Sequence, residues 1–172
     1  MIQDIRTNLQ EITSQVCDNL IISSDIYIWA LFFLLGTLTV ASLSDLKRMA
    51  AQKEFMEVWL AFAVIVFLFD LYSLKNPTFL ALKWGLIVVL ALLSWRKLGI
   101  LFKLYEMDVA AVCAVMSLLN PLYILAFYGV LFVTDRVMQR ILMKFGRGRN
   151  YPFLPVVLVA TVIIILLILI FA

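Results

Sequence analysis

The chain has 172 residues, of which 65% are hydrophobic, and its mean hydropathy is +1.08. A soluble domain of this size does not carry so apolar a sequence, whereas helices that cross a bilayer require one. Because lipid offers the backbone no hydrogen-bond partners, the fold class is expected to be an all-α membrane protein.

Two features of the composition narrow the chemistry. The sequence contains no histidine, which argues against His-ligated zinc proteases, serine–histidine intramembrane proteases and haem sites with His ligands. Its two cysteines, Cys17 and Cys113, are far apart and form no CxxC pattern, so they are expected to be free structural residues. No metal and no cofactor is therefore expected. No nucleic-acid partner is predicted either.

Residues 1–25 are predicted to form an amphipathic helix at the external membrane surface. Apolar residues recur there at steps of three and four, and on another face an acidic residue recurs every seven: Asp4, Glu11, Asp18 and Asp25. A membrane-skimming anchor is the simpler interpretation, and a partner-binding helix is the alternative.

Residues 26–172 are predicted to form one six-helix transmembrane bundle. Five apolar runs approach the ~20 residues needed to cross a bilayer; they are residues 26–44, 55–74, 79–95, 122–143 and 153–172. The fourth helix, from Asp108 to Leu119, would be only about 18 Å long. Residues 98–107 are then expected to lie along the membrane edge.

The basic residues predict the orientation. Eleven of the fourteen Lys and Arg residues fall on one side if the helices alternate: Lys47, Arg48, Lys53, Arg96, Lys97, Lys103, Arg136, Arg140, Lys144, Arg147 and Arg149. Cytoplasmic loops carry such an excess, so that side should face the cytoplasm and both termini should be external.

The same topology brings two carboxylates to one membrane depth. Asp45 ends the first helix, and Asp108 opens the fourth. An aspartyl protease needs such a pair, with one ionised Asp to activate water and one protonated Asp to polarise the scissile carbonyl. The alternatives are structural: Asp45 could pair with Arg48 three residues on, and Asp108 could be the N-cap of its helix.

Other acidic residues are assigned lesser roles. Asp135, near the cytoplasmic end of the fifth helix, is expected to pair with a base on another helix or to support the site. Glu106 could influence the charge near Asp108, whereas Asp70 should lie at the outer end of the second helix, away from the pair.

Two motifs resemble the prepilin and preflagellin peptidases of archaeal type, which are six-helix membrane aspartyl proteases also called type IV prepilin-like leader peptidases. The motifs are "SLSDLKRM" (residues 42–49) and "YEMDVAAV" (residues 105–112). In that family an Asp followed by basic residues ends the first helix, and a second Asp, in a Gly-x-Gly-Asp-like motif, opens the fourth. The resemblance implies that Asp45 and Asp108 are catalytic. "YPFLP" at residues 151–155 also looks like the family's proline-containing start of the last helix.

The sequence departs from the family pattern at the second motif. Tyr105 and Met107 replace its two glycines, which would allow a tight turn and a close backbone approach. The bulky residues could narrow the substrate groove or mark an inactive relative. The Pro-Asn pair usual after the first Asp is replaced by "AAQKEF". The cysteine-rich cytosolic insertion and N-methylation module of many bacterial members are also missing, so the resemblance implies no methyltransferase activity.

The resemblance implies cleavage of the leader of type IV pilin-like or archaellin precursors at the cytoplasmic membrane edge. The partners would be precursors with a basic leader and an apolar helix, and acidic Glu54, Glu57 and Glu106 could receive that leader. One alternative is an inactive relative that binds pilin-like helices or assists assembly. Another is a small transporter that uses Asp45 and Asp108, although these lie at an edge and no repeat is visible.

Overall fold

The computed structural model describes residues 25–48, 53–73, 77–98, 102, 104–142 and 152–171, and within them it is all-α. Six helices follow one another: α2 (Asp25–Arg48), α3 (Lys53–Ser73), α4 (Pro77–Ser94), α5 (Glu106–Ser117), α6 (Pro121–Leu142) and α7 (Leu154–Phe171). The prediction of a six-helix all-α fold is confirmed. The predicted amphipathic helix lies almost entirely outside the described residues.

The helix boundaries follow local sequence signals. Pro77 and Pro121 occupy the first positions of α4 and α6, where the missing N–H of proline would have no helical acceptor. The shortest helix, α5, begins at Glu106 with Tyr105 as its N-cap residue. The hypothesis that Asp108 is the N-cap is therefore wrong, because Asp108 is the third residue of the first turn.

Four of the described helices are long and apolar enough to cross a membrane: Tyr27–Lys47, Lys53–Ser73, Pro77–Ser94 and Pro121–Arg140. A shorter apolar helix, Leu154–Ile170, belongs to α7. With 12 residues, α5 is about 18 Å long and cannot cross ~30 Å of hydrocarbon by itself. The chain is therefore a helical membrane protein with a short helix inside its bundle.

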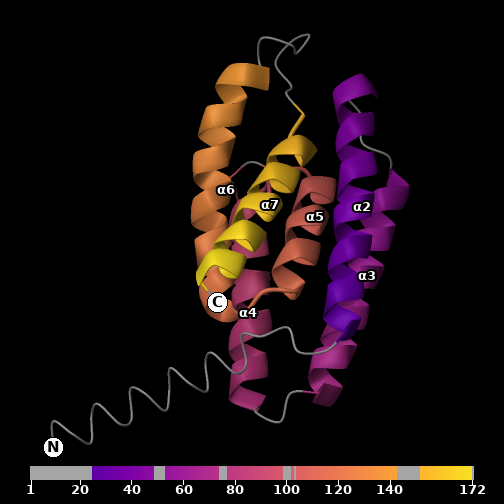
Figure 1. Ribbon diagram of the computed structural model, residues 1–172, viewed down its shortest axis with the longest axis vertical. Coiled ribbons are helices and arrows are strands. Elements are labelled where there is room, and N and C mark those ends of the chain that lie inside the picture. The colour runs from indigo at the N-terminus through magenta and orange to yellow at the C-terminus, as the bar shows by residue number, and fades with distance from the viewer. Residues whose placement is uncertain are drawn as a thin grey trace, which may run out of the picture.

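The short helix α5 is the centre of the bundle. It packs against α3, α4, α7 and, more lightly, α2, while α7 also joins α2 to α6. Figure 1 shows α5 between α7 and α2, with α3 beside α2. Ala110, Ala111 and Ala114 are buried on α5, and such small side chains let neighbouring helices approach closely in a membrane.

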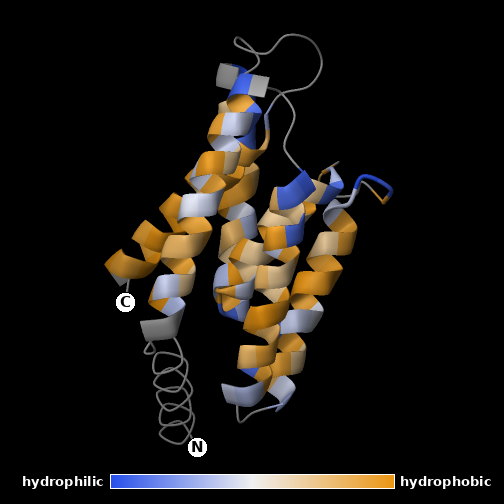
Figure 2. Ribbon diagram, turned by 90° about the vertical axis from the view of Figure 1, so that its right-hand side faces the viewer, coloured by the Kyte–Doolittle hydropathy of each residue, from blue (hydrophilic) through white to orange (hydrophobic). Residues whose placement is uncertain are grey.

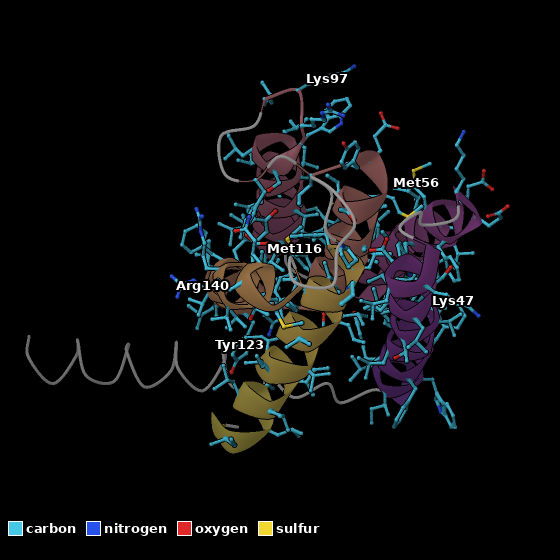
Figure 3. All side chains as sticks on the ribbon, turned by 90° about the horizontal axis from the view of Figure 1, so that it is seen from above. Lys47, Met56, Lys97, Met116, Tyr123 and Arg140 are labelled. Atoms are coloured by element: carbon cyan, nitrogen blue, oxygen red, sulfur yellow. The ribbon has the colours of Figure 1, made fainter. Side chains whose placement is uncertain are left out.

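Charged residues gather at one end of the bundle, where α2, α4 and α6 end and α3, α5 and α7 begin. Figure 2 shows this end as the hydrophilic one and the helices below it as largely apolar. We call it the basic end, after its described residues Lys47, Lys53, Arg96, Lys97, Arg136 and Arg140. In the view from above, Lys47, Lys97 and Arg140 lie around the rim and Met116 lies near the centre (Figure 3).

Two described residues of the connection between α4 and α5, Phe102 and Leu104, are buried, whereas Leu98 and Tyr105 are exposed. The N–H of Arg96 donates to the carbonyl of Leu104 at 3.0 Å, and the N–H of Leu104 donates to the carbonyl of Ser94 at 3.0 Å. Phe102 is buried, with its ring 6.1 Å from that of Tyr128. Phe102 and Leu104 thus anchor the described part of this connection to the bundle.

Candidate functional site

Asp45 lies on the buried face of α2, at the basic end. The buried residues of this face recur at helical spacing: Leu34, Leu38, Ala41, Ser42 and Asp45. Only 8% of Asp45 is exposed, and its Oδ2 accepts a hydrogen bond from the N–H of Leu154 at 3.4 Å. The N–H of Phe153 donates to the same carboxylate. Asp45 therefore satisfies two of the free N–H groups at the start of α7, where the helix dipole favours a negative charge.

Asp108 reaches the same region from the first turn of α5. It is half-buried, and it accepts a hydrogen bond from the backbone N–H of Tyr105. Burial, reinforced by the nearby charge of Asp45, raises the pKa of Asp108 to about 7. The structure thus brings the two carboxylates, 63 residues apart in the sequence, within electrostatic reach of each other.

This arrangement divides the protonation states of the pair near neutral pH. Burial of Asp45 disfavours its charged form, and the hydrogen bonds from two backbone N–H groups stabilise the ionised carboxylate and offset part of that cost. Asp108 has a pKa of about 7 and holds its proton over most of the acidic range. One carboxylate can therefore take a proton while the other gives one, which is what acid–base hydrolysis requires.

The residues that replace the two glycines point in different directions. Tyr105 is 53% exposed, and the guanidinium of Arg96 lies 4.8 Å from the centre of its ring. Met107 is partly buried and packs against the core. The tyrosine is therefore at the surface beside Asp108, whereas the methionine supports α5 from inside.

The remaining sequence candidates are not part of the pair. Glu106 is exposed in the first turn of α5, two residues before Asp108. Asp135 is half-buried on α6 and makes an interaction there, and α6 packs against α7 and α4. Within the described ranges, no three His, Cys, Asp or Glu side chains form a group that could hold a metal ion.

A second polar cluster, which the sequence interpretation missed, lies at the opposite end of the bundle. Asp70 is 1% exposed and its two oxygens accept three hydrogen bonds: from Tyr27 Oη at 2.6 Å, from Lys83 Nζ at 2.6 Å and from Trp84 Nε1 at 3.0 Å. Lys83 is itself buried. The cluster joins α2, α3 and α4.

A simple signal would have found this cluster. Asp70 and Lys83 are 13 residues apart on two apolar helices joined by a short connection, so they can face each other. On α2, Tyr27 and Asp45 are about 27 Å apart along the helix axis. The cluster is therefore separate from the carboxylate pair, and its hydrogen bonds are satisfied internally.

Comparison of the chain with protein-family models, with characterised proteins and with solved structures found no match.

Proposed function

We propose that the chain is a membrane-embedded aspartyl endopeptidase in which Asp45 and Asp108 are the catalytic pair. One observation carries the proposal: two acidic residues from separate helices lie within electrostatic reach of each other, and one of them has a pKa of about 7. Ionisable groups held within a membrane bundle mark functional sites more often than structural ones.

The mechanism follows from the different hydrogen bonds of the two carboxylates. Asp45, ionised beside the start of α7, takes a proton from a water molecule, whose oxygen attacks the scissile carbonyl carbon. Asp108 gives its proton to the carbonyl oxygen as the tetrahedral intermediate forms. The proton on Asp45 then passes to the leaving nitrogen, the C–N bond breaks, and Asp108 recovers its proton from the collapsing intermediate.

The location of the pair supports a substrate that is cut near the membrane surface. Asp45 is three residues from the end of α2, and Asp108 lies in the first turn of α5, both at the basic end. The family that the motifs resemble cuts pilin-like precursors between a basic leader and an apolar helix. Glu54 and Glu57, exposed in the first turns of α3, and exposed Glu106 belong to the same end and offer partners for a basic leader.

A second function, binding of pilin-like helices without cleavage, is favoured by one observation. Tyr105 stands where the family has a glycine, and Arg96 stacks on its ring at the rim of the site. If these two side chains keep the precursor backbone away from the carboxylates, the chain binds without cutting.

The test is a cleavage assay in liposomes with a panel of pilin-like precursors. Wild type should cut a precursor, Asp45→Asn and Asp108→Asn should each abolish the cut, and Asp135→Asn should retain more activity. Asn keeps the shape of the side chain and can still accept the backbone N–H bonds, but it cannot accept the proton. Cleavage only after Tyr105→Gly and Met107→Gly would favour the binding function for the natural chain.

A further inference from the structure

One buried hydroxyl group stands out in the described part of the bundle. Ser42 is 3% exposed, and its Oγ is the buried side-chain oxygen or nitrogen with no hydrogen-bond partner among the described residues. Buried polar groups without partners are rare, and each requires a physical explanation.

Other helical hydroxyls of the chain show what Ser42 lacks. Four of them donate to a carbonyl three or four residues earlier in their own helix, which is the usual solution in an apolar setting: Thr37 to Leu34, Thr39 to Leu35, Ser117 to Ala114 and Thr161 to Val157. The local solution is therefore available to α2, and Ser42 does not use it.

Ser42 lies next to the carboxylate pair. It precedes Asp45 by three residues on the same buried face of α2, so their Cβ atoms are about 5 to 6 Å apart. It is one turn further from the basic end than Asp45. On this face α2 packs mainly on α7 and only lightly on α5, which carries Asp108. The hydroxyl thus lies one helical turn from Asp45, on the helix that contacts both α7 and α5.

A peptidase substrate needs a hydrogen-bond donor at this depth. A peptide bond is cut in an extended backbone, so the start of the substrate's apolar helix must unwind to reach the carboxylates. In a water-poor bundle, the carbonyl groups released by unwinding require new donors.

We propose that Ser42 is a positioning residue that donates its hydroxyl to a backbone carbonyl of the unwound substrate, on the apolar side of the scissile bond. This inference rests on the proposed peptidase function. It explains why the resting protein keeps a buried hydroxyl free: the partner arrives with the substrate, between α2 and α5.

The test compares Ser42→Ala, Ser42→Thr and the matched control Ser117→Ala in the liposome cleavage assay. Ser117 is also a buried serine, but its hydroxyl is already bonded to the carbonyl of Ala114. Ser42→Ala should raise KM about tenfold with little change in kcat, because one hydrogen bond present in both bound states is lost. Ser42→Thr should restore most of the binding, and Ser117→Ala should leave KM unchanged.

Thermal stability in detergent separates positioning from structure. Ser42→Ala removes an unsatisfied buried hydroxyl, so its melting temperature should equal or exceed that of wild type even as KM rises. Two results would overturn the role of Ser42 but not the proposed function. One is an unchanged KM, and the other is a loss of activity that follows a fall in melting temperature and is not rescued by threonine. A wild-type chain that cuts no precursor overturns the proposed function, and this inference with it.

Discussion

Replacing Asp108 by Asn should stabilise the protein, and the gain should grow with pH. In the folded chain the pKa of Asp108 is raised from 3.8 to about 7, first by burial and then by the charge of Asp45. Between these two pH values the unfolded chain has lost the proton and the folded chain still binds it. Folding stability must therefore fall as the pH rises through this window and then level off above pH about 7.

The size of the effect follows from the two pKa values. Each pKa unit corresponds to ~1.36 kcal/mol, so the full penalty is on the order of 4 kcal/mol, and solvent at the half-buried carboxyl lowers it to about 2 to 4 kcal/mol. Asn carries no charge to desolvate and still accepts the N–H of Tyr105. Asp108→Asn should thus match wild type near pH 4 and exceed it by that amount near pH 8.

Unfolding of the purified protein in detergent, followed by thermal melting or denaturant titration across this pH range, measures the difference. Glu106→Gln is the matched control, because Glu106 lies in the same turn and is exposed. A difference that does not depend on pH, or an Asp108→Asn variant less stable than wild type near pH 8, would refute the claim that Asp108 is held in a charge-disfavouring site.

Three further predictions follow from the same structure. Asp70→Asn and Lys83→Met should each destabilise the bundle by about 3 to 5 kcal/mol in denaturant titrations, since breaking a buried ion pair leaves one charge unpaired. The double variant should recover much of this loss, and additive losses would contradict the prediction. The kcat/KM for precursor cleavage should fall above pH about 7 as Asp108 loses its proton, and a flat profile up to about pH 9 would remove Asp108 as the acid. Residues 97 and 72 lie at opposite ends of the bundle. In a chain without its native cysteines, Lys97→Cys should therefore react with an impermeant label only from the cytoplasmic side, and Tyr72→Cys only from outside. The reverse pattern overturns the orientation.

Hydropathy and the signals at helix ends are enough to predict most of the fold from the sequence. The apolar runs predicted all six helices to within a few residues, including the short α5, because lipid forces backbone hydrogen bonds to close within each helix. Asp45 and Asp108 could be paired in advance for the same reason: alternating helices place both at one end. Predicting that part of the site required only the order of the helices and their lengths.

Contacts between distant segments could not be predicted in this way. The hydrogen bond from Leu154 to Asp45 joins residues 109 positions apart, and no local pattern encodes it. The ion pair of Asp70 and Lys83 is different: hydropathy counts the two as separate penalties, but their spacing across a short connection between helices could have paired them. The inward fold of Phe102 depends on rings from α6 and from the start of α7.

The central claim is that Asp45 and Asp108 act as one catalytic unit. The most direct measurement is the single-turnover rate of precursor cleavage in liposomes for wild type, Asp45→Asn, Asp108→Asn and the double variant. If both residues are needed for the same catalytic step, removing either one already abolishes that step. The double variant should therefore be no slower than either single variant. Near wild-type cleavage by Asp45→Asn or by Asp108→Asn, or losses that multiply in the double variant, would contradict the account.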